Sequence, residues 1–287
     1  MTKFSVRSRR LVRAVGVLGV LLVVACSGSG VVVPPASLTD GSVLSTDAGG
    51  AATDGGAVAC SSEPALFDGK WTVGTSGPTT YHRFDHPTPK GLVIALHGTN
   101  GSSASVATKK KEWQSFHAAA RARGYSLLVP ESEQRDKPRR WDNSPSANNP
   151  DLVRLASLID EASRVGGLSP TSPIYLVGMS QGAGVAPIFG QLLAARGYPV
   201  RAVAAYCGGS SPIFSRPEYT LPTIFAAMAS DDVITDASAA VEANVSALKA
   251  RGVETSSYVK PSEKLWVKSL AVCKFGRSGY VYHAAIV

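Results

Sequence analysis

The feature that most constrains the fold is a serine between two glycines at the end of an apolar run. Residues 174–184 run Ile-Tyr-Leu-Val-Gly-Met-Ser-Gln-Gly-Ala-Gly, so residues 178–182 have the form Gly-x-Ser-x-Gly. The apolar residues before it predict a buried strand, and the small residues after it favour the start of a helix. A sharp turn between them needs glycines, because a side chain at either position would clash. The pattern predicts strand, turn and helix, with Ser180 exposed at the end of a sheet.

Other apolar runs predict the rest of that sheet. Besides the run that ends at Val177, they lie at Leu92–Leu96, Tyr125–Val129, Val200–Ala205, Thr223–Met228 and Val253–Val259. A further strand, Thr79–Phe84, is predicted to be antiparallel and at the edge. Helical periodicity falls between the strands at residues 110–123, 151–165 and 237–250. This alternation predicts an α/β fold, a doubly wound and mostly parallel sheet flanked by helices, with functional groups at the carboxyl ends of the strands.

The N-terminal part predicts an export signal rather than a folded element. Residues 1–25 join a basic stretch to an apolar run that is too short to span a bilayer comfortably, which is typical of a signal peptide. The residues that end at Cys26 resemble a bacterial lipobox, so we expect lipidation of Cys26; ordinary cleavage nearby is the alternative. Residues 26–59 are mostly small or polar and predict a flexible linker. The folded domain is expected at residues 60–287, in a protein that is lipid-anchored in the bacterial cell envelope or extracellular.

Charge and cysteine content narrow the possible partners. The net charge is +8, but five basic residues lie in the predicted signal peptide, and the remainder carries only +3. That balance gives no support to a nucleic-acid partner. Export permits a disulfide, and Cys60, Cys207 and Cys273 can form one bridge whose pairing the sequence does not choose. No cysteine spacing predicts a metal site, and no metal or organic cofactor is expected.

Residues of about 70–259 resemble the α/β-hydrolase superfamily. The resemblance rests on Leu96-His97-Gly98, the loop that contains Trp141, the segment Asp151–Asp160 and the residues Val177–Gly182. Within the superfamily, the chain is most similar to secreted bacterial esterases related to polyhydroxybutyrate depolymerases, feruloyl esterases and acetylxylan esterases. Departures from the family pattern are Met228-Ala229 in place of His-Gly, Pro187 in the helix after the serine, and the lack of a histidine soon after the last strand.

The resemblance implies roles for particular residues. Ser180 would be the nucleophile, and the backbone amides of Thr99 and Gln181 would stabilise the oxyanion. His97 would order its loop, with catalytic base as its rival role. The acid would be Asp232, with Asp231 as the alternative, and helix capping is a competing role for either.

Of the five histidines, only His283 follows these carboxylates, which gives the order Ser, Asp, His. His283 is therefore the expected base, if the C-terminal segment folds back to present it; the other possibility is an abnormal C-terminus. The chain is then expected to be a serine esterase that cleaves carboxylic esters, such as polysaccharide-linked acyl esters or polyesters, through an acyl-enzyme. The alternative is a non-catalytic surface lipoprotein that uses the same fold for binding. Trp141 either stacks on a sugar or aromatic acyl group or simply anchors its loop.

Overall fold

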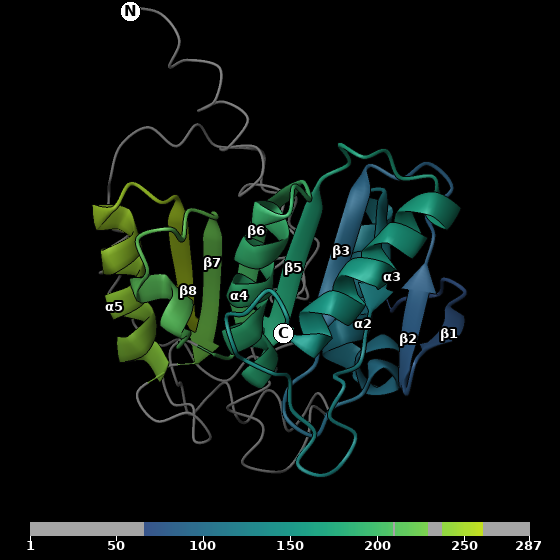
Figure 1. Cartoon of the computed structure of the whole chain (residues 1–287), viewed down its shortest axis with the longest axis horizontal. Helices are drawn as coiled ribbons and strands as arrows, with labels where there is room; N and C mark the ends of the chain where they lie inside the picture. Colours follow the sequence, from purple (N-terminus) through teal and green to yellow (C-terminus); the bar gives the residue numbers. More distant parts are fainter. Residues whose placement is uncertain (1–65, 209, 229–236, 261–287) are drawn as a thin grey trace, which may run out of the picture.

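One eight-stranded sheet organises the described part of the chain, residues 66–208, 210–228 and 237–260 of the computed structural model (Figure 1). In chain order the strands are β1 (Thr72–Ser76), β2 (Thr79–Phe84), β3 (Gly91–Leu96), β4 (Tyr125–Val129), β5 (Ile174–Met179), β6 (Val200–Tyr206), β7 (Thr223–Met228) and β8 (Thr255–Lys260). Their order in the sheet is β1-β2-β4-β3-β5-β6-β7-β8. The strands from β4 to β8 in this order are parallel, and β2 is antiparallel to both of its neighbours. The predicted doubly wound α/β sheet is confirmed.

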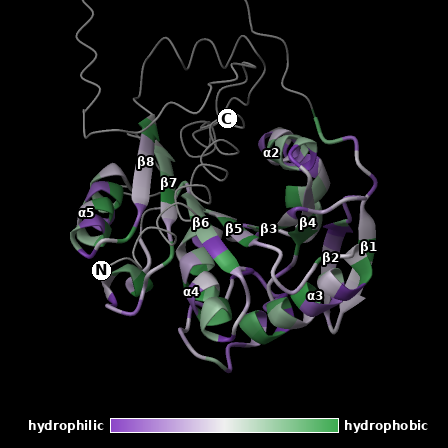
Figure 2. Ribbon diagram, turned by 90° about the horizontal axis from the view of Figure 1, so that it is seen from above, coloured by the Kyte–Doolittle hydropathy of each residue, from purple (hydrophilic) through white to green (hydrophobic). Residues whose placement is uncertain are grey.

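Helices cover both faces of the sheet. They are α2 (Lys111–Ala122), α3 (Pro150–Gly166), α4 (Gln181–Ala195) and α5 (Ala237–Ala250), with the short π-helical turn η1 (Ser105–Lys109) and the 3₁₀ turn η2 (Pro212–Ser215). Seen from above, α2 lies on one face, and α3 and α4 lie on the other (Figure 2). Side chains of α5 join the same core as those of α3 and α4.

Strand β3 shows why the central strands are apolar on both sides. Its residues Leu92, Ile94 and Leu96 belong to the core with α3 and α4, whereas Val93 and Ala95 belong to the core with α2. Successive strand side chains point to opposite faces, and here both faces are covered. An unbroken apolar run, rather than an alternating one, is therefore the right sequence pattern for this strand.

Most strands and helices agree with the prediction from sequence, but strand β1 was not predicted. The predicted helices correspond to α2, α3 and α5, and the predicted parallel strands to β3 through β8, with end shifts of one or two residues. The antiparallel direction of Thr79–Phe84 is confirmed, but its edge position is wrong, because β1 lies outside it. Strand β1 has mostly exposed Thr, Val, Gly and Ser residues, so it lacks the apolar pattern by which the other strands were found.

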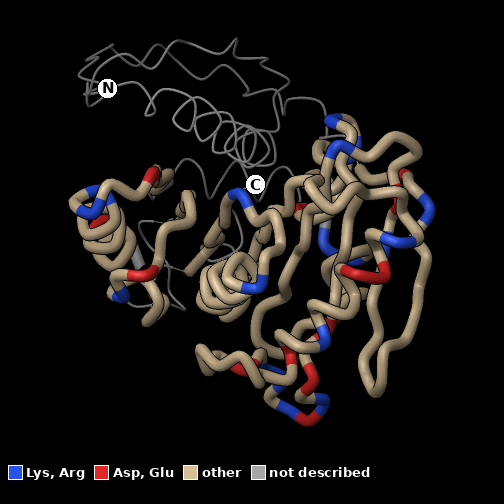
Figure 3. Tube along the Cα trace, turned by 45° about the horizontal axis from the view of Figure 1, so that its top comes forward, with Lys and Arg blue, Asp and Glu red and all other residues tan. Residues whose placement is uncertain are grey.

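Charged residues of both signs are interspersed along the described trace (Figure 3). One ion pair ties the sheet to a helix: Arg83 of β2, which is almost fully buried, lies 3.0 Å from Glu161 of α3. Another joins Arg154 of α3 to Glu133 in the loop after β4, at 2.6 Å.

Among the described residues, no helix has the length and apolar character needed to cross a membrane.

Candidate functional site

Ser180 lies directly after β5, where this strand turns into α4. Its backbone has φ 55° and ψ −120°, a combination that residues with a side chain rarely adopt. The Ser180 N–H donates to the carbonyl of Tyr206 at the end of β6, and its own carbonyl accepts from the N–H of Ala183, both at 2.9 Å. The predicted strand, sharp turn and helix are therefore present, and Ser180 lies at the carboxyl end of a central strand.

Gly178 and Gly182 make this turn possible through close packing of backbone. A Cβ on Gly178 would overlap the backbone of Gly182 and lie 2.7 Å from the Ala183 nitrogen. A Cβ on Gly182 would lie 2.5 Å from the carbonyl oxygen of Leu96 and 2.6 Å from that of His97. The elbow, here the segment Gly178–Gly182, thus packs directly on the end of β3.

Both predicted oxyanion donors lie beside Ser180. Gln181 is the first residue of α4, and Thr99 belongs to the loop after β3. The preceding residue, Gly98, lies so close to the serine that a Cβ on it would be 3.1 Å from the Ser180 Cβ and 3.6 Å from its Oγ. Neither the backbone N–H of Thr99 nor that of Gln181 donates a hydrogen bond to another residue within the described part of the chain. Such amides at a helix start and a nearby loop can donate to a ligand oxygen.

His97 is held as a structural residue. The ring is buried; its Nδ1 lies 2.8 Å from the Gly98 carbonyl oxygen, and its Nε2 accepts from the Ser132 N–H at 3.2 Å. These partners require a neutral ring with the proton on Nδ1. Burial lowers the pKa of His97 to about 4. Since both nitrogens are occupied, His97 orders its loop, and the rival role of catalytic base has no geometric support.

The other described histidines are also engaged or shielded. The Nδ1 atom of His82 lies 3.1 Å from the hydroxyl of Ser103, and that of His86 accepts from the Thr88 N–H at 3.1 Å. His117 is fully buried among aromatic rings, and neither of its ring nitrogens has a hydrogen-bond partner among the described residues. Burial alone lowers the pKa of His117 to about 3. Within the described residues, no histidine is placed to take a proton from Ser180.

Trp141 anchors its loop inside the protein. The side chain is 3% exposed, and its Nε1–H donates to the carbonyl of His97 at 2.7 Å. The indole packs against the His97 ring, with ring centroids 4.6 Å apart, and meets Phe189 of α4 edge-on. A ring buried in this way offers no face to a sugar or an aromatic acyl group, so the anchoring interpretation is the one that the structure supports.

Several predicted site residues lie outside the described residues. They are Asp231, Asp232, His283, Cys26, Cys60 and Cys273. The strand that precedes the two aspartates, β7, ends at Met228 as expected. Cys207, the third of the cysteines that could form the one predicted bridge, is buried directly after β6. The described residues contain no group of three or more His, Cys, Asp or Glu side chains that could hold a metal ion.

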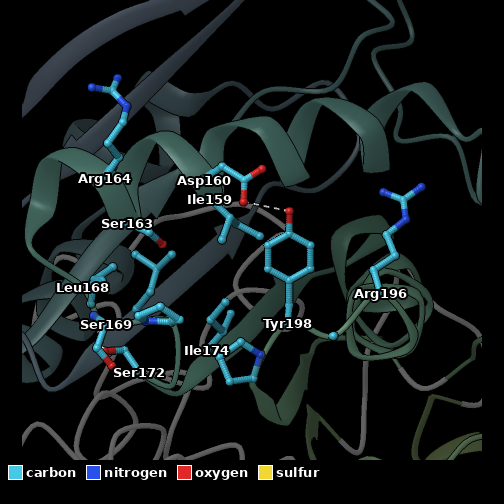
Figure 4. Close-up of a pocket in the computed structure, with 14 residues that line it drawn as sticks. Ile159, Asp160, Ser163, Arg164, Leu168, Ser169, Ser172, Ile174, Arg196 and Tyr198 are labelled. Carbon is cyan, nitrogen blue, oxygen red and sulfur yellow. Dashed lines mark hydrogen bonds between the residues drawn. The ribbon is translucent and has the colours of Figure 1, made fainter.

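A groove of about 610 Å³ opens at the other end of the sheet (Figure 4). Its walls include Ile174 at the start of β5, and the Tyr198 hydroxyl donates to Asp160 across it at 2.8 Å. Burial and the Asp160 carboxylate raise the pKa of Tyr198 to about 12. Because β5 rises about 3.3 Å per residue, its six residues separate this groove from Ser180. The groove is therefore distinct from the serine site.

Two side chains that organise the serine site carry no signal in the sequence. The side chain of Gln181 bonds both backbone groups of Trp141. Asp151, at the start of α3, is buried, and its carboxylate accepts from the amides of Glu133 and Asp142. Burial raises the pKa of Asp151 to about 6. An acidic residue just after Asn149-Pro150 is a normal helix start, and nothing in its spacing indicates contacts with a preceding loop.

Comparisons with known proteins find similarity at the level of the fold. No protein-family model matches the chain, and no curated protein matches its sequence. A solved structure named as a thermostable esterase matches with a TM-score of 0.52 and 15% identity, covering 70% of this chain and 56% of the esterase. Acylaminoacyl peptidase from Pyrococcus horikoshii matches with a TM-score of 0.51 and 12% identity, covering 72% of this chain and 42% of the peptidase. The chain thus spans about half the length of these two proteins.

Identities this low show a shared fold and do not show an activity. The strand order, the mostly parallel sheet with helices on both faces, and these matches define an α/β-hydrolase fold. In this fold the turn with Ser180 joins the central strand β5 to helix α4.

Proposed function

We propose that this protein is a serine esterase that cleaves carboxylic esters through an acyl-enzyme at Ser180. The observation that carries the proposal is the backbone of Ser180, which is held at φ 55° between a central strand and a helix. Such a conformation costs free energy, and it persists where the surrounding structure enforces it. At this turn the serine hydroxyl lies at the carboxyl edge of the sheet, beside two backbone N–H groups that have no acceptor among the described residues.

In the proposed reaction, a histidine takes the proton of Ser180 as its Oγ attacks the ester carbonyl. The amides of Thr99 and Gln181 donate to the developing oxyanion, and the leaving alcohol receives the proton from the histidine. Water then attacks the acyl-enzyme by the reverse sequence. Asp232 orients the histidine, with Asp231 as the alternative. This chemistry uses protein groups and water alone.

The base in this proposal is His283. The other four histidines of the chain are described, and each one is bonded elsewhere or enclosed by aromatic rings. This leaves His283 as the remaining candidate for the proton acceptor, and makes it the residue on which catalysis depends most.

Substrate class and location complete the proposal. The sequence resemblance to feruloyl, acetylxylan and polyhydroxybutyrate-cleaving enzymes favours polysaccharide-linked acyl esters or polyesters. The predicted signal peptide and Cys26 favour a protein held by a lipid anchor in the cell envelope. Replacement of Cys26 by Ala should move the protein from the detergent phase to the aqueous phase on phase separation; an unchanged distribution would argue against the anchor.

The first test is hydrolysis of p-nitrophenyl acetate by the wild type, Ser180→Ala and His283→Ala. Both variants should lose at least about 10³-fold in kcat, because the triad residues act as a unit. A fluorophosphonate probe should label Ser180 in the wild type, as located by mass spectrometry of the tryptic peptide. His117→Leu is a control that should keep full activity, because the His117 ring packs against aromatic side chains and has no role in the proposed chemistry. Equal background rates in the wild type and Ser180→Ala would refute the esterase.

A binding protein with the same fold is the second candidate. The observation in its favour is that every described histidine is committed elsewhere, so an activated serine requires a residue from the C-terminal segment. The fluorophosphonate probe separates the two functions, since a serine without a base should not react. Absence of labelling together with retention on an immobilised polysaccharide would favour the binding protein.

A further inference from the structure

The loop between β4 and α3, residues 130–149, is fastened to the residues that flank Ser180. Its central residue Trp141 is bonded through both backbone groups to one side chain of the elbow. The Trp141 N–H donates to Oε1 of Gln181 at 3.0 Å, and Nε2 of Gln181 donates to the Trp141 carbonyl at 2.8 Å. One side-chain amide thus forms hydrogen bonds with both the N–H and the carbonyl of Trp141, as the backbone of a neighbouring strand would.

The same loop also holds the segment on both sides of Thr99. Before Thr99, the His97 carbonyl accepts from the Trp141 indole at 2.7 Å. After Thr99, the Asn100 N–H donates to the Arg139 carbonyl at 2.9 Å, and the Arg139 N–H donates to the Asn100 side chain at 3.1 Å. The position of the Thr99 amide is therefore fixed by residues 139–141, which are themselves fixed by Gln181.

Asp151 secures this loop from the opposite side. One oxygen of its carboxylate accepts from the Glu133 N–H at 2.5 Å, and the other accepts from the Asp142 N–H at 2.6 Å. The side chain is nearly fully buried, so few water molecules can replace either donor. A buried carboxylate with one amide on each oxygen joins the start of the loop to the residue next to Trp141.

We propose that the side chains of Gln181 and Asp151 are positioning residues that set the spacing of the two oxyanion amides. Gln181 supplies one amide from its own backbone and, through Trp141 and the His97 carbonyl, holds the amide of Thr99. Asp151 keeps Trp141 in the place where these bonds form. This inference rests on the proposed esterase function. It adds that the loop after β4 is part of the catalytic framework rather than a substrate-binding flap.

The test replaces each link and measures both activity and amide exchange. Gln181→Met keeps the length of the side chain but removes both bonds to Trp141. Trp141→Phe keeps a ring against His97 and removes the indole donor. Asp151→Asn puts an NH₂ group opposite one of the two amides. Gln191→Met is the matched control, since Gln191 lies on the same helix α4 and its Oε1 accepts from the Thr220 N–H instead.

Each of the three variants should lower kcat by about 10–100-fold, because a misplaced oxyanion donor weakens transition-state stabilisation. KM should change by less than about threefold, since the ground-state ester does not depend on this spacing. Gln181→Met combined with Asp151→Asn should cost less than the product of the single effects, as expected for residues that act through one loop. Gln191→Met should match the wild type. Unchanged kcat in all three variants would overturn the proposal.

Hydrogen exchange gives a readout that does not depend on catalysis. Peptides covering residues 97–101 and 139–142 should exchange faster in Gln181→Met than in the wild type, and equally in Gln191→Met and the wild type. Unaltered protection in Gln181→Met would refute the coupling even if the wild type proved inactive. Faster exchange with an inactive wild type would keep the coupling and reject the esterase function. If Gln181→Met fails to fold, Trp141→Phe tests the same connection.

Discussion

At the scale of the residue, Ser180 has an unfavourable backbone conformation in the candidate site. Its positive φ is unfavourable for any residue with a Cβ, at about 1–3 kcal/mol, and is favourable for glycine. The neighbouring segments compensate for this cost: the N–H of Ser180 bonds to Tyr206 and its carbonyl to Ala183. A strained serine that the rest of the structure holds in place is expected where a hydroxyl has a task.

That strain can be measured apart from any activity. Ser180→Gly should be more stable than Ser180→Ala by about 1 kcal/mol, because glycine tolerates the backbone of the turn. Urea denaturation gives the free energies of unfolding. Ser157, an exposed residue within α3, provides the control pair, for which the order should be reversed and Ala should be better by about 1 kcal/mol. The same order at both positions would contradict the assignment of strain to Ser180.

At the scale of the element, Asn149 at the start of α3 both caps the helix and binds the preceding loop. Asn149 caps the helix by accepting from the Leu152 N–H at 3.1 Å. The same side chain donates to the carbonyls of Asp142 and Ser144, at 2.8 and 3.0 Å. A cap normally serves its own helix, whereas this one also ties the helix to the loop that holds Trp141.

Asn149→Ala should therefore cost more than a simple cap, about 2 kcal/mol or more of unfolding free energy. It leaves the partly buried carbonyl groups of Asp142 and Ser144, and the Leu152 amide, without their partner. The adjacent Asn148 is exposed, and its replacement by Ala should cost less than about 0.5 kcal/mol. Both values come from urea denaturation, and a similar small loss for the two variants would show that Asn149 is dispensable.

The sequence could predict those elements whose local pattern and burial agree. Strands β3 to β7 are mostly apolar because both of their faces are covered. Gly178 of the elbow is required by backbone contacts within five residues, whereas Gly182 is required by its contact with the end of β3. The role of Trp141 could not be predicted, because a tryptophan in a polar loop looks the same whether it faces solvent or a histidine ring. The bonds of Gln181 and Asp151 join residues up to 40 positions apart, and local spacing carries no information about them.

At the scale of the whole molecule, neutral histidines in the interior link stability to pH. The pKa of His97 is lowered to about 4 and that of His117 to about 3, so near pH 5 the unfolded chain binds two protons that the folded protein does not. Asp151 acts in the opposite sense, since its raised pKa of about 6 lets the folded state bind one proton first. The contribution of these three groups is a stability that falls with decreasing pH, by about 1.4 kcal/mol per unit.

His117→Leu should isolate one part of this dependence. The imidazole is surrounded by the rings of Phe67, Trp71, Trp113 and Phe116, and no charged group contributes to its pKa shift. As the pH falls from about 7 to 4, the wild type should lose stability relative to the variant, by up to about 1.4 kcal/mol per pH unit below pH 6. Urea midpoints measured across this range give the comparison. Parallel curves for the two proteins would show that His117 is not held neutral.

The close backbone contacts of Gly178 and Gly182 have a consequence for how this chain can diverge. A substitution at either glycine displaces the backbone of a neighbouring strand or turn, so it damages folding whatever the protein does. Ser180 is different, because its replacement by glycine relieves the strain of the positive φ. In relatives without the proposed activity, we expect substitutions at the serine position while both glycines are kept. Among related sequences, replacement of the serine while both glycines are kept would therefore mark the proteins that have lost the proposed catalysis.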